Sequence, residues 1–183
     1  MKSVLISIQP KWCELIANGK KTVEVRKTKP KLETPFKVYI YATKSGDRLV
    51  LKSDNVFEIS RAITGKVIGE FVCDKVIEFE NSMYEPAFHE TSVLSCVDFE
   101  KLALYLGKSD FGYGWHISNL VIYDKPRELR EFKTLPCEKP ESACGNCKYL
   151  EVTNTPNTYE VECYREDGIY LTRPPQSWCY VED

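Results

Sequence analysis

The stretch Gly19–Arg26, GKKTVEVR, carries three cations and one carboxylate within eight residues. Polar and apolar residues alternate along its second half, which is the pattern of a β-strand. On such a strand Glu24 and Arg26 share one face, and the two valines share the other. Lys21 has the parity of the valines, so it must lie in the turn before the strand if it is to join Glu24 and Arg26. The alternatives are a polar floor of a binding cleft and a structural ion pair.

A strand and a short helix are predicted before this stretch. Ser3–Ile8 alternates between apolar and other residues, as a strand does. Pro10 suits the first turn of a helix, and apolar residues recur at helical spacing over Trp12–Ile16. Gly19 is a natural C-terminal stop, because glycine adopts the left-handed conformation that commonly ends a helix.

Further strands and one more helix follow. Asp98 is a suitable cap for a helix with the sequence FEKLALYL, which Gly107 ends. Five or six strands with two or more helices give the α+β class, with a sheet curled into a small β-barrel. The later predicted strands are Phe36–Thr43, Lys66–Phe79, which is either two strands or one with a bend near Asp74, and Trp115–Tyr123.

The composition changes near residue 137. LPCEKPE, residues 135–141, contains two prolines and ends the hydrophobic periodicity. The segment after it is rich in cysteine and poor in long apolar runs. Such a short segment can hardly bury a core alone, and structural metal is the usual remedy. We therefore predict two parts, an N-terminal domain over residues 1–136 and a cysteine-rich extension over residues 137–183.

The net charge of −2 hides an asymmetry along the chain. Residues 11–44 hold nine Lys or Arg and three Glu, a balance of +6, whereas residues 137–183 hold four Lys or Arg and nine Asp or Glu, a balance of −5. The basic part is either a solvated face or a surface for an anion such as a phosphate backbone.

Nothing in the sequence predicts a membrane protein. No apolar run approaches the roughly 20 residues that span a bilayer. The apolar run at the N-terminus is too short for a signal peptide, and no small-residue cleavage site follows it. A cytoplasmic location is therefore expected.

The sequence SIQPKWCELIANGKKTVEVRK, residues 7–27, resembles the ASCH domain. The hallmark of that family is G-x-K-x-x-E-x-R after a helix, and Gly19, Lys21, Glu24 and Arg26 occupy its positions. The segments YIYATK, GKVIGEF and GYGWHISNLVIYDKP also resemble the family's remaining strands, in the expected order. The resemblance spans about residues 3–132. It implies a β-barrel related to PUA domains, which bind RNA, with the motif lining a cleft and RNA or a nucleotide as the partner.

The side chains of this motif suit such a ligand. Arg26 offers a planar fork to a phosphate or a base edge, Glu24 can orient it or accept from an exocyclic amine, and Lys21 supplies a point charge. Aromatic residues, among them Tyr41, are candidates for stacking on a base. The predicted ligand-binding residues are Ser7, Gln9, Trp12, Gly19, Lys21, Glu24, Arg26 and Trp115.

An enzyme is the first alternative. The resemblance includes a branch of small proteins that hydrolyses N4-acetylcytidine with a lysine, a threonine nucleophile and a distant glutamate. The lysine falls on Lys21, but the threonine position holds Glu24, and a carboxylate is no ready substitute for an activated hydroxyl. In a hydrolase of modified nucleosides or RNA, Lys21 and Glu24 are the candidate proton carriers. His89 and His116 are isolated and receive no catalytic role.

The cysteine-rich extension predicts a structural zinc site. Cys144 and Cys147 form a C-x2-C knuckle, and Cys163 and Cys179 each follow after 15 further residues. Four thiolates complete the tetrahedral shell of a structural Zn²⁺. Cys137 is the alternative to Cys179 as fourth ligand. A redox pair and disulfides are the rival interpretations.

The last residues add two weaker expectations. The segment PPQSWCY is similar to C-terminal segments of small proteins encoded by phages. A cysteine-rich tail is also a possible docking surface, so the second alternative function is a protein-interaction adaptor.

Overall fold

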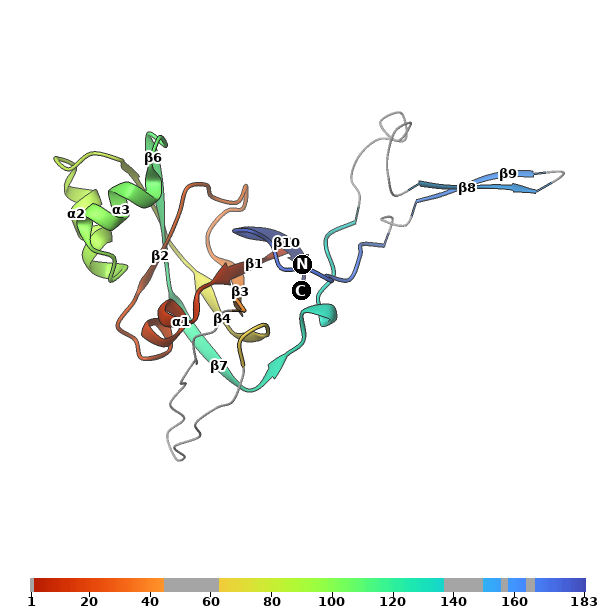
Figure 1. Cartoon of the computed structure of the whole chain (residues 1–183), viewed down its shortest axis with the longest axis horizontal. Helices are drawn as coiled ribbons and strands as arrows, with labels where there is room; N and C mark the ends of the chain where they lie inside the picture. Colours follow the sequence, from red (N-terminus) through yellow and green to blue (C-terminus); the bar gives the residue numbers. More distant parts are fainter. Residues whose placement is uncertain (1, 45–62, 137–149, 156–157, 164–166) are drawn as a thin grey trace.

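The computed structural model describes residues 2–44, 63–136, 150–155, 158–163 and 167–183 (Figure 1). Within them the chain forms three α-helices and ten strands. In chain order these are β1 (Lys2–Ile8), α1 (Pro10–Ala17), β2 (Val23–Arg26), β3 (Phe36–Ala42), β4 (Val67–Cys73), β5 (Val76–Glu80), α2 (Pro86–Leu94), α3 (Phe99–Leu106), β6 (Phe111–His116), β7 (Ser118–Arg127), the short 3₁₀ helix η1 (Leu129–Glu131), β8 (Leu150–Thr155), β9 (Thr158–Cys163) and β10 (Trp178–Glu182).

Two sheets and a separate hairpin organise these strands. The larger sheet has the order β10-β1-β3-β4-β7, in which β1 runs parallel to β3 and antiparallel to β10. The smaller sheet has the order β2-β6-β5 and is antiparallel throughout. The β8–β9 hairpin projects away from both sheets (Figure 1). The α+β class is confirmed.

The small barrel that we predicted is not closed among the described strands. β10 occupies one edge of the larger sheet and β7 the other, and these two edges do not pair. The chain crosses from the smaller sheet to the larger one at Ile117, between β6 and β7. One continuous strand was predicted here, because no Gly or Pro interrupts the apolar pattern around Ile117. The described strands therefore form two open sheets, and the chain passes from one to the other at Ile117.

Side-chain alternation on β1 explains its central position. Val4, Ile6 and Ile8 face one core cluster, in which α1 packs through Cys13 and Ile16. Every side chain from residue 3 to residue 8 is buried, as expected for a strand covered on both faces. β1 is thus fully enclosed, and its C-terminal end leads directly into α1.

Two further clusters complete the core. On the opposite face of the larger sheet, Leu5 packs with Tyr39, Tyr41 and Val181. The third cluster joins the smaller sheet to α2 and α3 through residues that include Val25 and Phe88. Sequence analysis did not predict α2, because polar residues interrupt any apolar stripe on it. This helix positions one wall of the site described below.

The C-terminal end is part of the main sheet. β10 pairs with β1 along Lys2–Ile6, so Trp178 lies opposite Ile6 and Glu182 opposite Lys2. The sequence predicts that a metal holds this tail in place, but the pairing of β10 with β1 already attaches it to the larger sheet. The division at residue 137 remains a prediction. Among the described residues, no helix is both long and apolar enough to cross a bilayer.

Candidate functional site: a buried Lys–Glu–Arg floor

The corner between α1 and β2 brings Lys21 into the site. α1 ends at Ala17, and Gly19 adopts φ +68°, a left-handed conformation that suits glycine. The backbone N–H groups of Lys20 and Lys21 then donate to the carbonyl of Leu15, at 2.9 and 3.0 Å. Lys21 therefore lies in the link before β2 and not on the strand, as its parity required.

Lys21 is buried and bound from several sides. Its side chain is enclosed, with only 3% of the residue exposed. Nζ donates to the backbone carbonyl of Ser95 at 2.8 Å and lies 3.2 Å from Oε2 of Glu24. The Trp12 ring centroid is 5.2 Å from Nζ, within the range of a cation–π contact. Ser95 follows α2, so this lysine ties the motif to the α2–α3 link.

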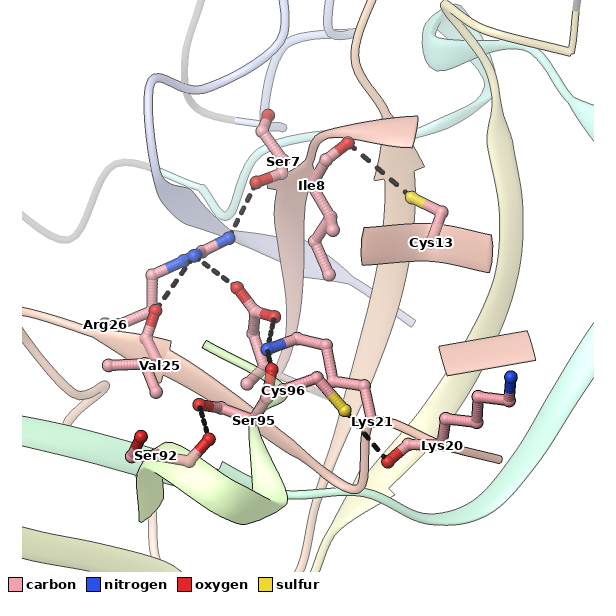
Figure 2. A network of polar contacts seen from close by, with 11 residues as sticks. Ser7, Ile8, Cys13, Lys20, Lys21, Val25, Arg26, Ser92, Ser95 and Cys96 are labelled. Atoms are coloured by element: carbon pink, nitrogen blue, oxygen red, sulfur yellow. Dashed lines mark hydrogen bonds and ion pairs between the residues drawn. The ribbon is translucent and has the colours of Figure 1, made fainter. Parts of the chain in front are cut away.

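Arg26 completes the group from the opposite side (Figure 2). Its Nη1 donates to Oε1 of Glu24 and to the carbonyl of Val25, and its Nη2 donates to the carbonyl of Ser7 at 2.7 Å. Glu24 is 4% and Arg26 8% exposed. We call Lys21, Glu24 and Arg26 the polar floor.

The polar floor retains two unpartnered groups. Oε2 of Glu24 and Nε of Arg26 are buried, and neither has a hydrogen-bond partner within the described residues. Lys21 Nζ is close enough to Oε2 for an ion pair, but its direction does not give a hydrogen bond. Most buried polar groups in proteins are hydrogen-bonded, and an unpaired one costs about 1–3 kcal/mol. The polar floor thus holds one buried acceptor and one buried donor that lack a hydrogen bond.

A cavity of about 480 Å³ contains the polar floor. Three parts of the chain enclose it: the junction of β1 and α1, the α2–α3 region, and the segment before β10. Six predicted residues line it, namely Ser7, Gln9, Trp12, Lys21, Glu24 and Arg26. The lining residues that sequence analysis did not assign are Ile8, Lys11, Val25, Thr43, Val97, Lys101, Leu102, Tyr105, Gln176 and Ser177.

The ASCH domain model matches residues 6–127, which include the end of β1, α1, the polar floor and the strands from β2 to β7. The chain belongs to the ASCH domain family.

Solved structures of ASCH proteins share the fold. The crystal structure of ASCH from Zymomonas mobilis has a TM-score of 0.51 at 17% identity, covering 69% of this chain and 73% of that one. A crystal structure of a mutant form from the same organism has a TM-score of 0.57 at 14% identity, covering 99% and 89%. At such identities the likeness concerns the fold alone. No curated protein sequence matched, and the comparisons do not support the phage resemblance.

Two residues predicted to bind the ligand of this ASCH domain lie elsewhere. Trp115 is fully buried in the core, where its ring packs edge-on to Phe36 at 5.7 Å and beside Trp178 at 5.9 Å between centroids. It does not line the cavity, so the structure does not bring it together with the other predicted ligand-binding residues. Gly19 shapes the corner without lining the cavity. Tyr41 is buried in the cluster on the far face of the larger sheet.

Cations and aromatic rings surround the opening of the cavity. Lys11 and Lys101 are both exposed, and Lys11 Nζ lies 4.4 Å from the centroid of the Trp12 ring. Lys101 forms an ion pair with Asp98 at the start of α3. Across the cavity, Tyr105 is 43% exposed. The opening therefore combines flat ring surfaces with positive charge.

The zinc prediction lies largely outside the described residues. Cys144 and Cys147 fall in the undescribed part, and Cys163 ends β9 in the projecting hairpin (Figure 1). Cys179 lies on β10 opposite Leu5, and burial raises the pKa of its thiol to about 11. In the part of the chain that the structure describes, no three metal-ligating side chains come together. Zinc binding and a docking role for the tail remain predictions.

The two histidines lie away from the cavity. His116 Nδ1 is 2.6 Å from Oδ1 of Asp74 in an exposed pair, and this hydrogen bond lowers the pKa of Asp74. The ring of His89 stacks on Phe99, with 4.9 Å between centroids. Neither residue lines the cavity.

Proposed function

We propose that this ASCH-domain protein binds RNA or a nucleotide in the cavity above the polar floor. The observation that carries the proposal is the buried Lys–Glu–Arg floor of the cavity, in which Glu24 Oε2 and Arg26 Nε have no hydrogen-bond partner. A ligand that carries both an acceptor and a donor would suit this floor. Nucleobase edges carry such neighbouring groups, and cytosine and adenine add an exocyclic amine that suits a carboxylate.

The rest of the cavity supports the same class of ligand. Its volume of about 480 Å³ lies within the usual range for a small-molecule site. Trp12 and Tyr105 offer ring faces, and base–aromatic stacking contributes about 1–3 kcal/mol per base. Lys11 and Lys101 are exposed at the opening, where a phosphate would remain partly hydrated. The floor itself carries a formal charge of +1, which also favours an anion.

A salt-dependent titration tests the proposal. RNA, DNA and free nucleotides are titrated against the parent protein and the Arg26→Ala variant. Affinity should fall as salt rises, because phosphate contacts release counterions, and Arg26→Ala should weaken binding at least about tenfold. Lys20→Ala is the matched control, since Lys20 is exposed and does not line the cavity. Equal binding by the parent and the Arg26 variant at every salt concentration would refute the proposal.

Hydrolysis of a modified nucleoside or of RNA is the second candidate. One observation favours it: the hydroxyl-bearing residues Ser7 and Thr43 line the same cavity as Lys21 and Glu24. A hydroxyl nucleophile needs a nearby base, and a carboxylate or a neutral lysine can serve as one. Incubation with acylated nucleosides and short RNAs should then yield product, and Thr43→Ala or Ser7→Ala should abolish it. No product across the panel would remove this candidate.

A further inference from the structure

The segment just before β10 forms one wall of the cavity, although it lies far beyond the residues that match the family. Gln176 and Ser177 line the cavity, whereas the family match ends at residue 127. The two residues reach the site because β10 pairs with β1, with Trp178 opposite Ile6. The end of the chain is therefore part of the candidate site. We call residues 174–177 the C-terminal wall.

The C-terminal wall is bonded directly to the support of the polar floor. The hydroxyl of Ser7 donates to the carbonyl of Pro175 at 2.7 Å, and the N–H of Ser7 donates to the carbonyl of Ser177 at 2.9 Å. The carbonyl of Ser7 in turn accepts from Arg26 Nη2 at 2.7 Å. One residue thus joins the wall to the guanidinium group, and it fixes the distance between them.

Two aromatic residues of β10 hold the wall in place from the other side. Nε1 of Trp178 donates to the hydroxyl of Thr28 at 3.1 Å, two residues after Arg26. The hydroxyl of Tyr180 accepts from the N–H of Lys31 at 2.7 Å. Both rings also pack against the core cluster that contains Trp115. A wall fixed at both ends in this way can present a side chain in a constant position.

Gln176 is the side chain that this wall presents to a ligand. It is exposed, it lines the cavity, and its amide makes no hydrogen bond within the described residues. An amide offers a donor and an acceptor together, which suits the edge of a base or a sugar hydroxyl. Its neighbours at the polar floor are charged, so this neutral group adds selectivity without adding charge.

We propose that the C-terminal wall is part of the ligand site and that Gln176 is its specificity-determining residue. The proposal rests on the proposed binding of RNA or a nucleotide. Gln176 hydrogen-bonds the sugar or the base edge of the nucleotide, while Ser7 acts as a positioning residue that couples the wall to Arg26. Gln176 thus sets the relative affinities for different nucleotides, and the polar floor sets the overall affinity.

The test measures the selectivity of the 183-residue chain among nucleotides. Dissociation constants are determined for the four ribonucleoside 5′-monophosphates and their 2′-deoxy forms, with the parent, Gln176→Ala and Gln176→Glu. Thr172→Ala is the matched control, because Thr172 is exposed, lies in the same segment and does not line the cavity. Thermal unfolding of each variant verifies that it is folded.

We expect the Gln176 substitutions to change the ratios of affinity among the nucleotides. Gln176→Ala should alter the affinity ratio between the best and worst nucleotide by about tenfold, and Thr172→Ala should leave it unchanged. If the parent binds nucleotides and Gln176→Ala keeps the same ratios within about twofold, the inference is overturned and the proposed function stands. If the parent binds none of the nucleotides, the inference and the nucleotide form of the proposed function are both overturned.

Discussion

Lys21 and Ser95 are 74 residues apart in the sequence, yet Nζ of the lysine donates to the carbonyl of Ser95 at 2.8 Å. This bond joins the α1–β2 corner to the end of α2. The same ammonium lies 3.2 Å from Oε2 of Glu24, so one buried cation connects the motif of the first 26 residues with the α2–α3 wall of the cavity. In this chain the position of Lys21 in the turn before β2 is what allows both contacts.

Lys21→Met should destabilise the fold as well as the site. Methionine has a similar length but leaves the carbonyl of Ser95 without its donor and Glu24 with one cation fewer. We expect the free energy of unfolding to fall by about 2–4 kcal/mol. The control Lys20→Met changes an exposed neighbour and should stay within about 0.5 kcal/mol. Urea denaturation measures both, and equal effects of the two substitutions would contradict the structure.

Glu24→Gln should make the cavity favour a charged nucleotide over its uncharged nucleoside. The substitution changes the charge of the polar floor from +1 to +2 while nearly keeping its shape. The affinity for a nucleotide relative to its uncharged nucleoside should therefore rise, and stability should fall by about 1–3 kcal/mol because two buried cations lose their counter-charge. Calorimetric titration with both ligands measures the ratio, with Glu14→Gln on the exposed side of α1 as the control. A ratio that does not change would contradict the assigned role.

Substitution of Trp12, but not of Trp115, should weaken ligand binding. Trp12→Ala removes a ring face from the cavity and should weaken nucleotide binding about tenfold, and it should also lower the free energy of unfolding by about 1–3 kcal/mol because the ring packs against a core cluster. Trp115→Phe alters a fully buried ring and should lower the free energy of unfolding by about 1–3 kcal/mol while binding stays within about twofold. Fluorescence titration and thermal unfolding separate the two effects. Loss of binding in the Trp115 variant alone would restore its predicted place in the site.

Metal analysis can separate the two possible fourth ligands of the predicted zinc site. Cys179 lies on β10 in the larger sheet, where it packs against the apolar cluster that contains Leu5. A metal ligand at this position would have to lie within a packed apolar cluster, so we propose Cys137 as the fourth ligand. Elemental analysis should show zinc in the parent and in Cys179→Ser, and little in Cys147→Ser. Loss of zinc in Cys179→Ser would return the fourth position to Cys179.

The polar floor could be predicted because its three residues are close in the sequence and their positions follow from local secondary structure. Alternation on β2 places Glu24 and Arg26 on one face, and Gly19 ends α1 early enough to leave Lys21 in the turn. The walls could not be predicted in the same way. Lys101 and Tyr105 approach the site only because α2 and α3 pack on the smaller sheet, and no sequence spacing encodes that contact.

The predictions for Trp115 and for the C-terminal tail differ from the structure because contacts between distant parts of the chain place both. Trp115 is predicted from its ring alone to contact the ligand, but the strand around it is closely packed: a Cβ at the neighbouring Gly114 would lie 2.9 Å from the side chain of Val23. That glycine therefore permits close packing in the core. The C-terminal tail was interpreted as a metal-anchored segment, although its last residues alternate: Trp178 and Tyr180 pack on one core cluster, and Cys179 and Val181 on another. The pairing with β1 joins residues at opposite ends of the chain.

The most direct measurement follows the side-chain N–H resonances of Arg26 by nuclear magnetic resonance while a nucleotide is added. If its guanidinium group receives the ligand, these resonances should shift with the same dissociation constant as calorimetry gives, and those of the exposed Arg130 should not move. Saturable binding that leaves the Arg26 resonances in place would contradict the account.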